Sequence, residues 1–253
     1  TGDSDVCRDS LIKWRRMGDS IEMLDLRKAY LQFHVDERLW PFQKVKYKGR
    51  TYCLTRLGFG LSSPPKIMSS VLGRVLSMNP KILLATNHYI DDIAVDTRLV
   101  SVDQVISHLA SYGLETKPVE NMNGARVLGL RIEKRRDGKL MWSRGNAVEC
   151  SIGTNPMTRR ELFSLSGKLV GHYPVATWLR VVCSYVKRCG EGKNWNDSVG
   201  ERCHSMMSEL VSRVQREDPV KGEWLVRNSV DNVVWCDANS ISLGVVLQVD
   251  GEV

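Results

Sequence analysis

The chain has 253 residues, 42% of them hydrophobic and 26% charged, with a formal net charge of +7 at pH 7. This is an ordinary globular composition for one or two domains, and it excludes a low-complexity chain. No apolar run approaches the ~20 residues that a membrane helix needs, so we expect no membrane partner. The basic balance permits a polyanionic partner without requiring one.

Seven cysteines are scattered along the chain without a Cys-x-x-Cys pair. An odd number without that spacing argues against a disulfide framework and a zinc site, and it fits a reducing compartment such as the cytoplasm. The chain starts without methionine and stops just beyond Asp250-Gly251, a typical hairpin turn. We therefore expect an internal piece of a longer polypeptide.

The first part of the chain predicts short elements. An apolar cluster within the polar residues 1–20 predicts a short helix. Residues 21–35 predict a strand that runs into a helical turn, and residues 45–54 predict a hairpin. Pro64 and Pro65 then open an amphipathic helix, because proline is favoured in the first turn of a helix.

A doubled aspartate follows that helix. Tyr89-Ile90-Asp91-Asp92 lies between the apolar runs 83–85 and 93–95, which predicts a strand, a tight turn and a strand. The next elements are an amphipathic helix over 102–112, a strand over 127–132 and, after an Asp137-Gly138 turn, a return strand over 140–142. Together these elements indicate an α+β domain over roughly 20–145.

The remainder is helical before it returns to strands. Residues 158–161 have the form of a capping box and open a helix. Further helices are predicted over 176–188 and 199–216, and strands over 233–249.

Three aspartates are candidates for metal binding. Burying the like charges of Asp91 and Asp92 is costly unless a cation shares the site, and hard oxygen ligands suit magnesium. Asp25 ends an apolar strand and could supply the third carboxylate that two-metal phosphoryl transfer draws from separate strands. The alternatives are a solvated hairpin tip for the pair and a helix N-cap for Asp25.

Five motifs in this order resemble the palm of reverse transcriptases, most closely those in the pol polyproteins of LTR retrotransposons and retroviruses. The motifs are Met23-Leu24-Asp25-Leu26-Arg27-Lys28-Ala29-Tyr30-Leu31-Gln32, Leu57-Gly58-Phe59-Gly60-Leu61-Ser62-Ser63-Pro64-Pro65, Tyr89-Ile90-Asp91-Asp92, Lys117 after Tyr112-Gly113-Leu114, and Val127-Leu128-Gly129-Leu130-Arg131-Ile132. They span about 110 residues of the chain.

The resemblance implies a role for each candidate residue. Asp25, Asp91 and Asp92 would bind two Mg²⁺ ions, or Mn²⁺ in their place. Lys117 would neutralise or protonate pyrophosphate. Tyr30 would reject a ribose 2′-hydroxyl, with Phe59 and Gly60 beside the nucleotide. The hairpin around Leu128, Gly129 and Leu130 would grip the primer end, and Asp237 would be the first carboxylate of an incomplete ribonuclease H-like part. The alternatives are a core tyrosine for Tyr30, ordinary packing for Phe59 and a solvated side chain for Lys117.

The resemblance also implies an organisation and a function. The fold class would be α+β: a right-hand polymerase palm, an antiparallel sheet with two helices, followed by thumb and connection helices and the first strands of a ribonuclease H-like domain. The ranges are a fingers remnant or linker over 1–20, the palm over 21–145, thumb and connection over 146–228, and a truncated ribonuclease H-like start over 229–253.

The expected activity is that of an RNA-directed DNA polymerase fragment. Its partners would be an RNA or DNA template with primer, dNTP and other segments of the pol polyprotein, in the cytoplasm, in virus-like particles or in the nucleus. Residues 1–20 are shorter than the fingers that precede Asp25 in the family, which leaves activity of this chain alone open. The rival hypothesis is a non-catalytic, nucleic-acid-binding remnant of a decayed or domesticated element.

Overall fold

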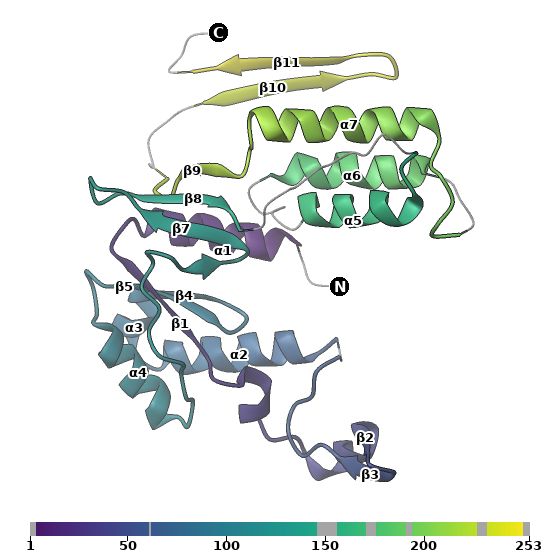
Figure 1. The fold of residues 1–253 in the computed structure, drawn as a ribbon. Helices are drawn as coiled ribbons and strands as arrows, with labels where there is room; N and C mark the ends of the chain where they lie inside the picture. Colours follow the sequence, from purple (N-terminus) through teal and green to yellow (C-terminus); the bar gives the residue numbers. More distant parts are fainter. Residues whose placement is uncertain are drawn as a thin grey trace.

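A computed structural model describes the chain over residues 4–60, 62–145, 156–170, 176–190, 194–226 and 232–249. Helices and strands are mixed, in an α+β arrangement with small antiparallel sheets. Figure 1 shows a layered body, a group of helices beside it, and hairpins that extend away from it. Within the described residues, no helix is both long and apolar enough to cross a membrane.

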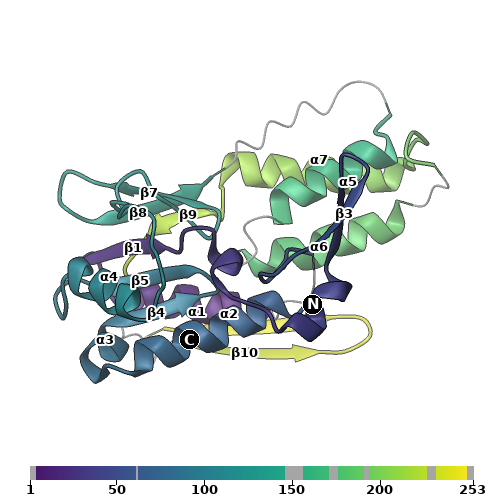
Figure 2. The same cartoon turned by 90° about the horizontal axis from the view of Figure 1, so that it is seen from below.

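A three-stranded antiparallel sheet lies at the centre of the layered body. Its strands, in spatial order, are β1 (Ile21–Asp25), β5 (Asp92–Asp96) and β4 (Thr86–Tyr89). One face is covered by α2 (Pro64–Ser77), α3 (Pro80–Ala85) and α4 (Val102–Ser111) (Figures 1 and 2). Because strand side chains alternate between faces, Leu24 and Ile93 enter the core on this side.

The opposite face of the sheet packs against a second layer. Met23 and Ala94 point to this side, where the core includes α1 (Ser4–Arg16). Trp14 of α1 is fully buried, and its indole nitrogen donates a hydrogen bond to the Asn87 side chain of β4 over 2.8 Å. The N-terminal segment is therefore helical, as the sequence predicts, and it contributes to the core.

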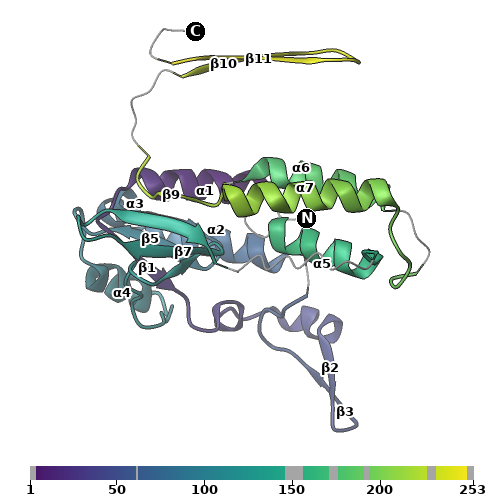
Figure 3. The ribbon, with the colours of Figure 1, turned by 45° about the horizontal axis from the view of Figure 1, so that its top comes forward.

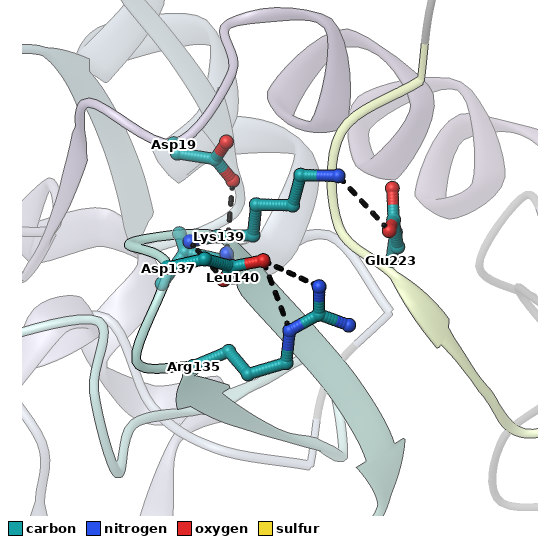
Figure 4. Close-up of polar contacts among 6 residues, drawn as sticks. All are labelled: Asp19, Arg135, Asp137, Lys139, Leu140 and Glu223. Carbon is teal, nitrogen blue, oxygen red and sulfur yellow. Dashed lines mark hydrogen bonds and ion pairs between the residues drawn. The ribbon is translucent and has the colours of Figure 1, made fainter.

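The second layer also contains a four-stranded antiparallel sheet. Its strands, in order, are β6 (Arg126–Val127), β7 (Leu130–Lys134), β8 (Leu140–Arg144) and β9 (Lys221–Glu223). Figure 4 shows how the turn between β7 and β8 is held: Arg135 pairs with Asp137, and Lys139 with Glu223 of β9. In the same view, the Leu140 amide donates to Asp19, at 3.1 Å. The hairpin is thus anchored to parts of the chain before and after it.

Three helices lie beside the second layer and share its core. They are α5 (Arg159–Val170), α6 (Thr177–Cys189) and α7 (Glu201–Arg216). Thr158 and Glu161 form the predicted capping box of α5, since the Thr158 amide donates to the Glu161 carboxylate and the Glu161 amide to the Thr158 hydroxyl. All three helices were expected from the sequence.

Two hairpins project from the body. The first consists of β2 (Lys44–Tyr47) and β3 (Arg50–Cys53) and follows the 3-10 helices η1 (Ala29–Gln32) and η2 (Glu37–Phe42). The second consists of β10 (Val233–Ala238) and β11 (Leu243–Gln248). The first extends from the body beside η2 (Figure 1), and the second stands clear of the other elements in Figure 3.

The elements expected from local sequence patterns differ from the structure at three places. Residues 83–85 are helical, not extended, because the Asn79 side chain accepts hydrogen bonds from the Lys81 and Ile82 amides and caps α3. Residues 127–132 form a tight hairpin, as the resemblance implies, and not the single strand that the apolar pattern alone predicts. Strand β9 was not predicted, because its pairing with β8 joins residues about 80 positions apart.

A buried ion pair fixes the segment between α7 and β9, and its loss should be costly. Asp218 accepts hydrogen bonds from two nitrogens of Arg144, both at 2.8 Å, and the Arg144 side chain is only 6% exposed. Asp218→Ala removes this carboxylate and should lower the free energy of unfolding by about 3 kcal/mol. Arg213→Ala, which breaks an exposed pair with Glu209, should change it by less than about 0.5 kcal/mol. Urea denaturation measures both; equal losses would contradict the difference in burial.

Candidate active site

The turn between β4 and β5 presents the doubled aspartate. Tyr89 pairs with Asp92 across the hairpin, so Ile90 and Asp91 alone form the connection. Ile90 has φ +56°, a left-handed conformation that is strained for a β-branched residue. Such strain is held only where the surrounding structure imposes it, and it often accompanies function. The predicted tight turn is therefore present, with Asp91 in it.

The neighbouring strand places a third carboxylate at the same end of the sheet. Asp25 is the last residue of β1 and lies directly opposite Asp92 in the antiparallel register. The Leu26 amide donates to the Asp91 carbonyl oxygen, at 3.4 Å. Side chains Asp25, Asp91 and Asp92 thus come from two adjacent strand ends, the arrangement expected from the sequence.

The carboxylates influence one another electrostatically. Burial, followed by the charges of Asp91 and Asp25, raises the pKa of Asp92 to about 7. Burial and the charge of Asp25 also raise the pKa of Asp91, while Lys117 acts in the opposite direction. The end of the sheet therefore carries more negative charge than its own surroundings neutralise at pH 7.

The other end of the same strand pair shows the contrast. Asp96 closes β5 opposite Ile21, and it is buried. Arg98 donates to both of its carboxyl oxygens and holds the pKa of Asp96 below its usual value. One end of the sheet thus has a carboxylate with a matched structural partner, whereas the other concentrates three.

Lys117 supplies a cation at the carboxylate end. Its segment runs along the free edge of β1, where the Lys117 amide donates to the Asp25 carbonyl oxygen at 2.8 Å. Its ammonium group forms an ion pair with the Asp25 carboxylate, which raises the pKa of Lys117. Lys117 therefore contacts Asp25 through both its backbone and its side chain.

Gln32 positions this segment, a role that no local sequence pattern predicts. Its side-chain nitrogen donates to the Glu115 carbonyl oxygen at 2.9 Å, and its side-chain oxygen accepts from the Glu115 amide at 2.8 Å. These paired bonds join η1 to the segment two residues before Lys117. A contact between residues 83 positions apart leaves no local pattern to detect.

Two aromatic side chains form a pair, and one of them, Tyr30, senses the charge of Asp91. The rings of Tyr30 and Phe59 meet edge to face, with centroids 5.3 Å apart. Burial and the negative charge of Asp91 raise the pKa of Tyr30, so the phenol is close enough to sense that carboxylate. Phe59 is 71% exposed, which is unusual for ordinary packing. Gly60 follows with φ +86°, a conformation that glycine adopts readily.

The remaining candidates lie elsewhere in the fold. Leu128 and Gly129 both have positive φ, and they form the two-residue turn between β6 and β7. Leu130 is buried in the core beneath that turn. Asp237 lies on β10 opposite Gly244 and is exposed, in the hairpin that stands apart in Figure 3.

The donor set suits a divalent cation, although the side chains are not gathered around one point. Among the described residues, no three His, Cys, Asp or Glu side chains are arranged closely enough to hold a metal ion as they stand. Nevertheless, one oxygen of Asp25 is buried without a hydrogen-bond partner, and burial together with the charges of Asp91 and Asp25 raises the pKa of Asp92. Mg²⁺ and Mn²⁺ bind carboxylate oxygens whose negative charge is not fully neutralised by neighbouring cationic side chains.

Comparison with solved structures identifies the fold. A foamy viral protease-reverse transcriptase in complex with RNA/DNA hybrid matches 92% of this chain with a TM-score of 0.59 and 18% sequence identity. A second structure of the foamy viral protease-reverse transcriptase, with double-stranded DNA, matches 93% of this chain with a TM-score of 0.59 and 17% identity. The chain has a reverse-transcriptase-like fold.

The likeness covers only part of those proteins. The chain spans 32% of the first and 41% of the second. One family model, a domain of unknown function (DUF7047), matches residues 158–216, which contain α5, α6 and α7. No curated protein matches the sequence.

The raised pKa values predict how stability depends on pH without divalent ions. The unfolded chain releases the Asp92 proton near pH 3.8, whereas the folded chain keeps it until about pH 7. The free energy of unfolding therefore falls as pH rises through this window. Asp92→Asn should remove the effect and, at pH 7.5 with EDTA, raise the free energy of unfolding by about 2 kcal/mol.

Thermal denaturation of both proteins from pH 5 to pH 7.5 tests this expectation. The difference in melting temperature should grow with pH and shrink when Mg²⁺ is added to the unsubstituted protein. A difference that does not vary with pH would contradict it.

Proposed function

We propose that this chain is the polymerase segment of an RNA-directed DNA polymerase and transfers a nucleotide from dNTP to a primer 3′-hydroxyl. The register that sets Asp25 opposite Asp92, with Asp91 in the adjoining turn, carries the proposal. Carboxylates from separate strands are what two-metal phosphoryl transfer requires. The reverse-transcriptase-like fold supports the same reaction class by analogy.

In this proposal Asp25, Asp91 and Asp92 hold two Mg²⁺ ions, with Mn²⁺ as a substitute. When bound, such ions lower the pKa of the attacking hydroxyl and neutralise the charge of the departing pyrophosphate. Lys117 then leaves Asp25 and pairs with pyrophosphate oxygens. Because its pKa is raised, it acts mainly as a positive charge, and a proton is transferred only if that pKa falls on release.

The Tyr30–Phe59 pair would form the floor of the nucleotide site. Burial and the charge of Asp91 raise the pKa of Tyr30, and its ring would contact the sugar of a nucleotide whose phosphates meet the carboxylates. Phe59 presents an exposed ring for packing on the base or the template. Leu128, Gly129 and Leu130 are the proposed primer grip.

The proposed organisation follows the ranges expected from the sequence. Residues 21–145 would be the palm, and the helices within 146–228 the thumb and connection, which bind the primer–template duplex. Basic residues there are proposed to meet phosphates: Arg159, Arg160, Lys168, Arg180, Lys187 and Arg188. The β10–β11 hairpin with Asp237 would begin a ribonuclease H-like domain of a retroelement pol polyprotein.

Primer extension tests the proposed function. The chain is incubated with poly(rA)/oligo(dT), dTTP and Mg²⁺, beside Asp91→Asn. Extension that is lost in the variant supports the proposal. If the chain is inactive, the same assay is repeated after fingers sequence from the parent protein is added upstream. Inactivity of both forms, with nucleic-acid binding retained, would overturn the proposal in favour of a non-catalytic binding protein.

A further inference from the structure

The β2–β3 hairpin is exposed on both faces. Every residue of the two strands is exposed, and the hairpin pairs with no other strand among the described residues. Figures 1 and 3 show it extending from the body on the side of η2. The side chains of these strands gain little stabilisation from packing, because a two-stranded hairpin with both faces exposed is only marginally stable in water.

The two faces of the hairpin differ in chemistry. Tyr47 lies opposite Arg50, and Val45 opposite Tyr52, which places these four side chains on one face. The other face carries the pairs Lys44–Cys53 and Lys46–Thr51. One face is thus aromatic with a guanidinium group, and the other is basic without an aromatic ring.

The aromatic face is also positively charged at its tip. Lys48 begins the turn, and its ammonium group lies over the Tyr47 ring, 5.4 Å from the centroid. Tyr47 is 63% exposed and Tyr52 is 48% exposed. Rings with adjacent cations are the surface on which single-stranded nucleic acids stack, because every base has a π-face and every nucleotide a phosphate.

The surrounding charge favours an anionic occupant. Residues 43–59 contain five Lys or Arg residues and neither Asp nor Glu. Within the described part of the chain, Lys44, Lys46 and Arg50 form no ion pair with a carboxylate. Their charges are therefore available to phosphates.

The hairpin is continuous with the candidate active site. Its stem is an antiparallel pair in which the Leu57 amide donates to the Phe33 carbonyl oxygen at 3.0 Å and the Val35 amide to that of Thr55 at 3.1 Å. One end of this stem follows directly from the helix that holds Tyr30, and the other leads to Phe59. A single nucleic-acid strand that leaves the nucleotide site and follows this stem would reach the hairpin.

We propose that the face formed by Val45, Tyr47, Arg50 and Tyr52 binds the unpaired template strand ahead of the primer–template duplex, by stacking on its bases. This inference rests on the proposed function, because it assigns a template to that site. The basic face would contribute only general attraction to nucleic acid.

Binding to two labelled substrates tests the proposal without catalysis. One is a duplex with an unpaired 5′ template overhang, and the other is the same duplex with blunt ends. Fluorescence anisotropy in the absence of dNTP should show that Tyr47→Ala with Tyr52→Ala weakens overhang binding by about tenfold or more. Blunt-duplex binding should change by less than about twofold. Circular dichroism should be unchanged, because the two rings are outside the core.

Lys44→Gln with Lys46→Gln is the matched control on the opposite face. It should weaken binding of both duplexes by a similar factor, and the difference from the unsubstituted protein should disappear as salt is raised. The proposal would be overturned if the tyrosine variant bound both duplexes equally more weakly, or bound both as tightly as the unsubstituted protein. It would also be overturned if the variant changed self-association, measured by sedimentation, and left nucleic-acid binding unchanged. These results are independent of primer extension, so an inactive chain that prefers overhangs would refute only the catalytic proposal.

Discussion

Asp25→Asn should reduce primer extension by at least about a thousandfold while leaving the chain folded. The substitution keeps the shape of the side chain and the backbone register opposite Asp92. It removes one carboxylate charge from a cluster that already raises the pKa of Asp92 and Asp91. Stability without divalent ions should therefore be retained or improved, even though Lys117 loses its ion-pair partner. Single-nucleotide incorporation and thermal denaturation measure the two effects.

Asp96→Asn is the control at the other end of the same strand pair. Asp96 is buried and holds Arg98 through short hydrogen bonds, of 2.9 and 2.6 Å. Its replacement should lower the free energy of unfolding by about 2 kcal/mol, yet leave extension per folded molecule within about twofold. If both variants lose activity in proportion to stability, Asp25 has a structural role and the assignment is wrong.

The strands of the site could be predicted from sequence because their local patterns agree with their tertiary packing. Leu24 and Ile93 are apolar residues that the helices cover, and the acidic residues follow where the strands end. Residues 83–85 were wrongly expected to be a strand because their local pattern does not agree with their tertiary packing. Leu83 and Leu84 are apolar but 50% and 77% exposed, and the capping of α3 by Asn79 outweighs their strand-like composition.

Long-range contacts within the site left no comparable signal. The resemblance placed Lys117 near the chemistry, but its ion pair with Asp25 depends on a segment held by Gln32. Likewise, the sequence predicts the hairpin over residues 45–54. That both of its faces are exposed follows only from the structure, in which the hairpin projects from the body. Local periodicity predicts which elements form, and tertiary placement decides which of their polar groups meet.

The ring of Tyr30 should control the choice of sugar. In the proposed site, its bulk would lie where a ribose 2′-hydroxyl projects, because the charge of Asp91 reaches the phenol and Phe59 supports the ring edge to face. Tyr30→Val removes the ring and should raise kcat/KM for a ribonucleotide relative to its deoxynucleotide by about a hundredfold. Single-turnover incorporation of rNTP and dNTP on the same primer–template measures this ratio.

Tyr30→Phe separates the bulk of the ring from its hydroxyl group. It keeps the edge-to-face contact with Phe59 and removes only the phenolic oxygen, so steric exclusion predicts that discrimination stays within about threefold of that of the unsubstituted protein. Relaxed discrimination in Tyr30→Phe equal to that in Tyr30→Val would instead assign selection to a hydrogen bond from the phenol. Unchanged discrimination in both variants would remove Tyr30 from the nucleotide site, and the likeness of motif and fold would then not extend to substrate choice.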